Sequence, residues 1–130
     1  MTVRYGLEDR TVLLTGAAGG IGQALARAFA AQGARLLLVD REAAALDALV
    51  ESLRSHRVHS AVCELGSDAQ VREVAAQVAA RFGRLDVLIH NAGTEYTTPV
   101  DDASDGANAR WAVLLDNNVS GMWRLTRALS

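Results

Sequence analysis

The sequence predicts an α/β fold in which parallel strands form one open, doubly wound sheet with helices on both faces. Two observations lead to this prediction. Short apolar runs alternate with longer segments whose apolar residues recur every three or four positions, which is the order strand, helix, strand, helix. Short connections in such an alternation favour right-handed crossovers between parallel strands, so we expect the strand order 3-2-1-4.

The first strand and helix flank a glycine-rich turn. The apolar run Val12 to Leu14 is typical of a strand that is buried on both faces. Helical spacing follows from Gly20 to Gln32, and Gly33 provides a stop at the carboxyl end. The residues expected to share one side of this helix are Ile21, Leu25, Ala28 and Phe29.

Three more strands are predicted, over Arg35 to Asp40, Val58 to Cys63 and Leu85 to His90. A helix from Arg41 to Ser55 joins the first two of these. A third helix has Ser67 and Asp68 as candidate N-caps and ends at Gly83. Its inward residues are expected to be Val71, Val74, Ala75, Val78 and Phe82.

The last third of the chain begins with a polar loop that contains Pro99 and the stretch Asp101 to Gly106, and we expect this loop at the surface. From about Asn108 the sequence is helical to its end. We therefore expect residues 1–130 to form a single partial domain, the first half of a doubly wound sheet, truncated within the helix after the fourth strand. The open sheet edge and exposed Met122, Trp123 and Leu129 predict a homo-oligomer or other self-association.

Composition narrows the function. Half of the 130 residues are hydrophobic, enough for one core, and the net charge of −2 argues against nucleic acid or an anionic membrane as a partner. The single Cys63 lies in an apolar run, where a free thiol behaves as a small buried hydrophobe. Without a targeting or membrane-spanning segment, a cytoplasmic location and a small soluble ligand are expected.

The turn Thr15-Gly16-Ala17-Ala18-Gly19-Gly20-Ile21-Gly22 is the most informative motif. Gly16 permits a sharp turn out of the strand, and the later glycines let a pyrophosphate approach backbone N–H groups at a helix N-terminus. Asp40 and Asn91 end two other strands on the same carboxyl edge of the predicted sheet. Together these features predict a dinucleotide site.

The spacing G-x-x-x-G-x-G after a leading Thr resembles the short-chain dehydrogenase/reductase family, whose NAD(P)-binding domain is Rossmann-like. The resemblance implies that the cofactor contacts Gly16, Ala18, Gly19, Gly20, Ile21 and Gly22. It also implies that Glu64 and Leu65 meet the adenine. His90-Asn91-Ala92-Gly93 resembles the family's Asn-Asn-Ala-Gly, which assigns Asn91, Ala92 and Gly93 to the cofactor ribose and leaves His90 as a departure from the pattern.

Asp40 decides the cofactor. Its carboxylate can accept hydrogen bonds from the ribose hydroxyls, whereas a 2′-phosphate would bring like charges together, so NAD(H) is favoured over NADP(H). The neighbouring Arg41 complicates this prediction, because an Arg at this turn can bind a 2′-phosphate. A solvated charge in the first turn of a helix is the alternative explanation for Arg41.

The segment from Trp111 to Gly121 is similar to the family's Trp-…-Asn-x-x-Gly. On that resemblance Asn118 is the catalytic Asn that holds a water in a proton relay, and a shift of one residue would select Asn117 instead. An ordinary amide pair that caps the last helix is the structural alternative. No metal-ligand spacing surrounds His56 or His59.

The family's later Ser and Tyr-x-x-x-Lys motif has no counterpart in these residues. Neither Tyr5 nor Tyr96 is followed by a suitable lysine, and the 130 residues contain no Lys. Without a positioned proton donor, hydride exchange with an alcohol or carbonyl is not expected from this chain alone.

Three hypotheses follow from the sequence. The first is the cofactor-binding portion of an NAD(P)-dependent oxidoreductase that acts on a small alcohol or carbonyl. The second is a non-catalytic module that binds NAD or pairs with another subunit. The third is a half-enzyme that a second chain completes.

Overall fold

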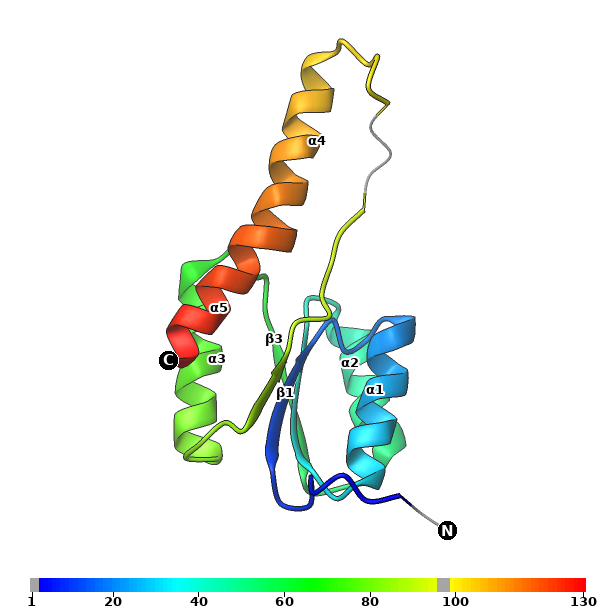
Figure 1. Cartoon of the computed structure of the whole chain (residues 1–130), viewed down its shortest axis with the longest axis vertical. Helices are drawn as coiled ribbons and strands as arrows, with labels where there is room; N and C mark the ends of the chain where they lie inside the picture. Colours follow the sequence, from blue (N-terminus) through cyan, green and yellow to red (C-terminus); the bar gives the residue numbers. More distant parts are fainter. Residues whose placement is uncertain (1–2, 96–98) are drawn as a thin grey trace.

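The computed structural model describes residues 3–95 and 99–130, and Tyr96 lies outside them. Its four strands are all parallel and lie in the order β3-β2-β1-β4, as the sequence predicted (Figure 1). The strands are β1 (Thr11–Thr15), β2 (Arg35–Asp40), β3 (Val58–Val62) and β4 (Val87–Ile89). The helices are α1 (Gly20–Ala31), α2 (Ala43–Leu53), α3 (Asp68–Arg81), α4 (Asp105–Leu115), the π-helical turn η1 (Asp116–Ser120) and α5 (Gly121–Leu129).

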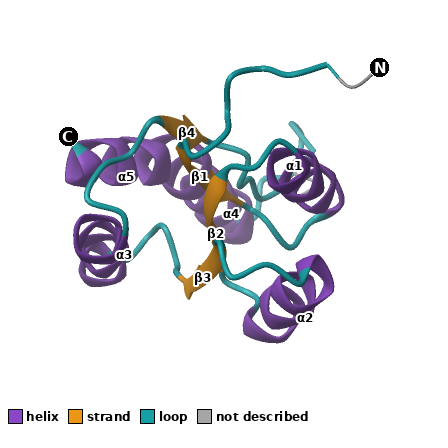
Figure 2. Ribbon diagram, turned by 90° about the horizontal axis from the view of Figure 1, so that it is seen from below, coloured by secondary structure: helices purple, strands orange, loops and turns teal. Residues whose placement is uncertain are grey.

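Helices cover both faces of the sheet (Figure 2). Successive side chains of a strand point to opposite faces, so Val12 and Leu14 of β1 pack with α1 and α2 while Leu13 packs with α3 and α5. Strands β1 and β2 are buried on both faces, which explains their continuous apolar sequences. This core holds the carboxyl ends of the four strands side by side at one edge.

Element ends differ from the predicted ones for local reasons. The α2 helix begins at Ala43 rather than Arg41, because the side chain of Asp40 accepts a hydrogen bond from the Glu42 amide (3.0 Å) and forms a turn there. The same helix ends at Leu53, where Arg54 adopts a left-handed conformation with φ 47°. Ser67 is the N-cap of α3, as predicted, and accepts a hydrogen bond from the Gln70 amide.

The inward face of α1 differs from the predicted one. Gly22 and Ala26 are buried, Leu25 and Phe29 pack partly against the core, but Ile21 and Ala28 are exposed. The helix approaches the glycine turn so closely that a Cβ at Gly22 would lie 2.0 Å from the Gly16 carbonyl oxygen. This close approach rotates the small residues inward and turns Ile21 outward.

The chain after residue 104 follows one helical path that begins away from the body of the molecule and returns to it (Figure 1). The α4 helix extends away from the sheet, and α5 lies beside α3 (Figure 1). Leu125 is fully buried against the α3 side of the core, and Leu129 is half-buried there, so the expected exposure of Leu129 is wrong. The α4 helix begins at Asp105, inside the stretch expected to be a loop, because an acidic residue favours a helix N-terminus.

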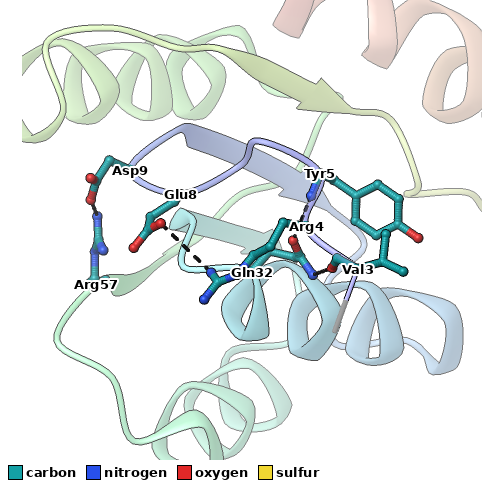
Figure 3. A network of polar contacts seen from close by, with 7 residues as sticks. All are labelled: Val3, Arg4, Tyr5, Glu8, Asp9, Gln32 and Arg57. Atoms are coloured by element: carbon teal, nitrogen blue, oxygen red, sulfur yellow. Dashed lines mark hydrogen bonds and ion pairs between the residues drawn. The ribbon is translucent and has the colours of Figure 1, made fainter. Parts of the chain in front are cut away.

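Polar contacts hold the N-terminal segment against the body (Figure 3). The Gln32 side chain accepts a hydrogen bond from the Tyr5 amide (3.1 Å) and donates one to the Val3 carbonyl (3.0 Å). The Arg57 guanidinium pairs with the Asp9 carboxylate. These contacts fix the residues before β1 at the edge of the sheet opposite to the carboxyl ends.

Candidate functional site

A cavity of about 460 Å³ opens at the carboxyl edge of the sheet, and a volume of this size is typical of small-molecule sites. It is formed by the turn after β1, the ends of β2 and β3, and the loop after β4. The predicted cofactor-binding residues that line it are Gly16, Ala18, Gly19, Gly20, Ile21, Gly22, Asp40, Arg41, Glu64, Leu65, Asn91, Ala92 and Gly93. Segments far apart in the sequence therefore meet around one space.

The glycine turn makes the floor of the cavity from backbone alone. Gly16 has a φ of +64°, and a Cβ there would lie 2.8 Å from the Cα of Ala92, so a side chain fits neither the conformation nor the space. A Cβ at Gly20 would meet no atom within 4 Å. The turn therefore presents open backbone to the cavity.

The N-terminus of α1 lies at this space, because its N-cap Gly19 and its first residues Gly20 to Gly22 line the cavity. Among the described residues, no side chain caps this helix end, and its N-cap residue is Gly19. The first N–H groups of a helix have no acceptor within the helix, and they carry the positive end of the helix dipole. An anionic group such as a diphosphate satisfies both requirements.

Asp40 lies against the glycine turn at the edge of the cavity. One carboxylate oxygen accepts a hydrogen bond from the Ala18 amide (2.9 Å) and the other accepts from the Glu42 amide (3.0 Å). Each oxygen keeps a further lone pair for a ligand hydroxyl. The neighbouring Arg41 guanidinium lies 3.7 Å from the Glu42 carboxylate, so its charge is partly paired.

Thr15 joins the ends of β1 and β4. Its buried hydroxyl donates to the Ile89 carbonyl (3.3 Å) and accepts hydrogen bonds from the amides of Asn91 (3.1 Å) and Ala92 (3.0 Å). The Asn91 side chain in turn donates to the Gly16 carbonyl (3.1 Å). These contacts fix the spacing between the glycine turn and the Asn91-Ala92-Gly93 wall.

The loop after β3 forms another wall. Leu65 is 9% exposed and supplies an apolar surface to the cavity, while Glu64 is exposed. Cys63 also lines the cavity, and burial, followed by the charges of Glu64 and Glu73, raises the pKa of its thiol to about 11. The thiol is thus protonated at neutral pH and acts as an apolar side chain.

The two asparagines of η1 have different surroundings. Asn117 lines the cavity, while the Asn118 side chain pairs with the backbone of Thr94: its Oδ1 accepts from the Thr94 amide and its Nδ2 donates to the Thr94 carbonyl, both at 2.8 Å. The pair therefore lies inside a continuous helical path and does not cap a helix. Asn118 anchors the loop after β4 beside the cavity.

His90 lies just outside the cavity at the end of β4. Its Nε2 is 2.8 Å from the Thr126 hydroxyl, and burial lowers the pKa of its imidazole. His90 Nδ1 is buried, and no hydrogen-bond partner for it is found among residues 3–95 and 99–130. Within those same residues no group of three or more His, Cys, Asp or Glu side chains is placed to hold a metal ion, and no helix is long and apolar enough to cross a membrane.

Sequence reasoning missed several residues around the cavity. The lining residues that were not predicted to contact the cofactor are Thr15, Val39, Glu42, Ala45, Cys63, Thr94 and Asn117, of which Asn117 was considered only as the alternative to Asn118. Thr15 leads the glycine motif and Thr94 follows Asn91-Ala92-Gly93 directly, so their places beside predicted residues were the available signal. Ala45 carries no such signal, because only the packing of α2 brings it to the cavity, and Glu42, the N-cap of α2, reaches the cavity through the turn that it forms with Asp40.

Residues 10–130 match the sequence profile of the family described as short chain dehydrogenase. The chain therefore belongs to the short-chain dehydrogenase/reductase family, as the glycine turn indicated. The family's members are NAD(P)-dependent oxidoreductases, and the fold found here, with strand order 3-2-1-4, is the Rossmann-like arrangement of their cofactor domains.

Individual relatives align with nearly the whole chain. D-threitol dehydrogenase of Mycolicibacterium smegmatis is 36% identical over 127 residues, which are 96% of this chain and 48% of that protein. A short-chain dehydrogenase/reductase from Brucella melitensis described as glucose/ribitol dehydrogenase superposes with a TM-score of 0.90 at 34% identity, over 98% of this chain and 53% of the other. L-sorbose reductase from Gluconobacter frateurii, solved in complex with NADPH and L-sorbose, gives 0.85 at 31% identity, over 95% and 47%. The chain thus spans about half the length of these relatives.

Proposed function

We propose that this chain forms the cofactor-binding part of a short-chain oxidoreductase and binds the adenosine diphosphate side of NAD(H) in the cavity at the carboxyl edge of the sheet. The proposal rests on one observation: an uncapped helix N-terminus, a glycine turn and the Asp40 carboxylate all border the same cavity. The amides at the start of α1 would bind the diphosphate, Asp40 the ribose hydroxyls, and Leu65 the adenine. When bound, the nicotinamide would supply hydride chemistry.

NAD(H) is the proposed cofactor, in preference to NADP(H). Asp40 lies beside the backbone of Ala18, where a 2′-phosphate would meet a carboxylate at close range. Among the described residues that line this cavity, the one cation is Arg41, and its charge is partly paired with the Glu42 carboxylate at 3.7 Å. L-sorbose reductase, a relative that binds NADPH, shows that the family accommodates the phosphate, so the preference rests on Asp40.

Asn118 is the proposed contributor to a proton relay in the complete protein. Its amide is already paired with Thr94, so any water would be held by the remaining lone pair of Oδ1 or by the backbone. The 130 residues contain no Tyr-x-x-x-Lys motif. We therefore expect these 130 residues to bind the cofactor without turning over an alcohol or a carbonyl compound.

Calorimetry with NAD, NADP and ADP-ribose tests the proposal. We expect saturable binding, tighter for NAD than for NADP, and a loss of about 1–3 kcal/mol of NAD binding energy in Asp40→Ala, because one charged acceptor is removed. NADP binding should change less in this variant. Asp47→Ala, an equal charge change on the exposed face of α2, is the matched control and should bind as the wild type does. Equal affinity of wild-type protein for NAD and NADP would contradict the assigned preference.

A second candidate function is a non-catalytic module that binds NAD(H) or pairs with another subunit. It is favoured by the intact adenosine-side cavity in a sequence that has no lysine. This function would be supported over the first if the chain bound ADP-ribose as tightly as NAD, and if a longer polypeptide that includes this sequence also failed to oxidise or reduce a substrate.

A further inference from the structure

Arg124 of α5 lies outside the cavity but contacts two of the segments that build it. Its Nη1 donates to the Leu65 carbonyl at 3.3 Å, and its Nη2 donates to a carboxylate oxygen of Asp116. Its Nε lies 3.6 Å from the Asp68 carboxylate. The Arg124 side chain is 25% exposed, so these contacts are largely shielded by the surrounding chain.

Both main contacts of Arg124 lead directly to the cavity. Leu65 lines the cavity from the loop after β3. Asp116 begins η1, whose next residue, Asn117, lines the cavity, and whose Asn118 holds the backbone of Thr94, another lining residue. One guanidinium therefore connects the loop after β3, through η1, with the loop after β4.

The two segments joined by Arg124 have little room to move independently. A Cβ on Gly66 would lie 3.2 Å from the Asp116 carboxylate, and one on Gly121 would lie 3.0 Å from the Cβ of Leu65. Tightly packed segments transmit small displacements rather than absorbing them. The planar fork of an arginine also fixes the directions of its two acceptors, which a lysine ammonium does not.

We infer that Arg124 and Asp116 are a positioning pair that holds Leu65, on the adenine side of the cavity, in place against η1. Through this pair, binding of a ligand on the adenosine side changes the conformation of the loop at Thr94. The inference rests on the proposed cofactor function of the cavity. The pair does not touch the space where the ligand would lie, so its effect on binding is indirect. Loss of the pair should loosen the Leu65 wall while the glycine turn and Asp40 remain in place.

The test uses AMP, which would occupy the adenosine side alone, and ¹⁵N-labelled protein in which the Thr94 amide resonance is followed. Wild-type protein should bind AMP and shift the Thr94 resonance. Arg124→Met keeps most of the aliphatic stem and removes the guanidinium, so AMP binding should weaken about fivefold and the Thr94 shift should be lost. Asp116→Asn should behave alike, and the double variant should be no weaker than Arg124→Met, because the two residues act as one unit.

Asp68→Asn is the matched control. Its carboxylate is 71% exposed and is the more distant acceptor, so AMP affinity and the Thr94 shift should stay as in the wild type. Should Arg124→Met fail to fold by circular dichroism, Asp116→Asn, whose side chain is 44% exposed, gives the same comparison. Wild-type AMP affinity and an unchanged Thr94 shift in the folded variants would overturn the inference alone. A wild-type protein that binds no AMP would overturn both it and the proposed function.

Discussion

Two glycines in the first turn of α1 have different surroundings, and this difference leads to a prediction at the scale of single residues. Gly22→Ala places a methyl group where the Gly16 carbonyl and the Ala17 backbone already lie, and neither can move without distorting the turn. We expect the free energy of unfolding to fall by about 1–3 kcal/mol or more, as in other overpacked sites. Urea denaturation monitored by circular dichroism measures this change.

Gly20→Ala is the control for that prediction, because the added methyl group would meet open space. The free energy of unfolding should stay unchanged or rise by less than about 1 kcal/mol, since alanine loses less backbone entropy than glycine on folding. Equal destabilisation by the two variants would contradict the prediction, because helix propensity favours alanine over glycine at both positions and only Gly22 packs against the turn.

At the scale of elements, Asp86 attaches the start of β4 to β1. Its carboxylate accepts a hydrogen bond from the Thr11 amide (2.8 Å), its own amide donates to the Thr11 carbonyl (3.0 Å), and Arg84 and Arg10 lie beside it. The hydrogen bond from Thr11, followed by those two arginines, lowers the pKa of the Asp86 carboxyl below its ordinary value of 3.8. The short strand β4 therefore depends on an ionised side chain that precedes it.

Because the pKa of Asp86 is lower in the folded protein than in the unfolded chain, its contribution to stability is complete above pH 3.8 and is lost as the pH falls through the folded value. Asp86→Asn should therefore be less stable than the wild type at pH 7, and the difference should shrink as the pH falls below about 4. Urea denaturation of both proteins at a series of pH values between 7 and 2 measures this difference in the free energy of unfolding. Asp47→Asn, at an exposed position, should run parallel to the wild type. A constant difference at all pH values would exclude the carboxylate as its cause.

At the scale of the whole molecule, apolar side chains remain exposed along the path from α4 to α5. Trp111 is 59% exposed, Val119 59% and Trp123 66%, and β4 has a neighbouring strand on one side only within residues 3–95 and 99–130. Exposed apolar patches and open sheet edges promote association. The chain by itself is therefore expected to self-associate.

The double variant Val119→Gln, Trp123→Gln removes two of these side chains, which lie four residues apart. Sedimentation velocity should show association of the wild type that increases with concentration and a clear shift toward monomer in the variant. Val100→Gln, at a fully exposed loop position, should sediment as the wild type does. A wild-type monomer at all concentrations would contradict the prediction.

Sequence and structure agree most closely where local rules act. The alternation of strands and helices, the strand order and the meeting of Gly16, Asp40 and Asn91 at one edge all follow from periodicity and from the handedness of crossovers. The sequence could not predict that Ile21 turns outward, because that depends on how closely Gly22 lets α1 approach the turn. Ala28, which was expected on the inward side of the same helix, is exposed for the same reason.

By itself the sequence determined the family, the order of the sheet and the composition of the cavity floor, since glycine turns and apolar periods act over a few neighbouring residues. Tertiary structure alone decided that the Asn118 side chain hydrogen-bonds to the Thr94 backbone instead of capping a helix, and that Arg124 hydrogen-bonds to both Leu65 and Asp116. These contacts link residues that are 8 to 59 positions apart. Their partners are selected by the packing of α5 against α3, which no local pattern specifies.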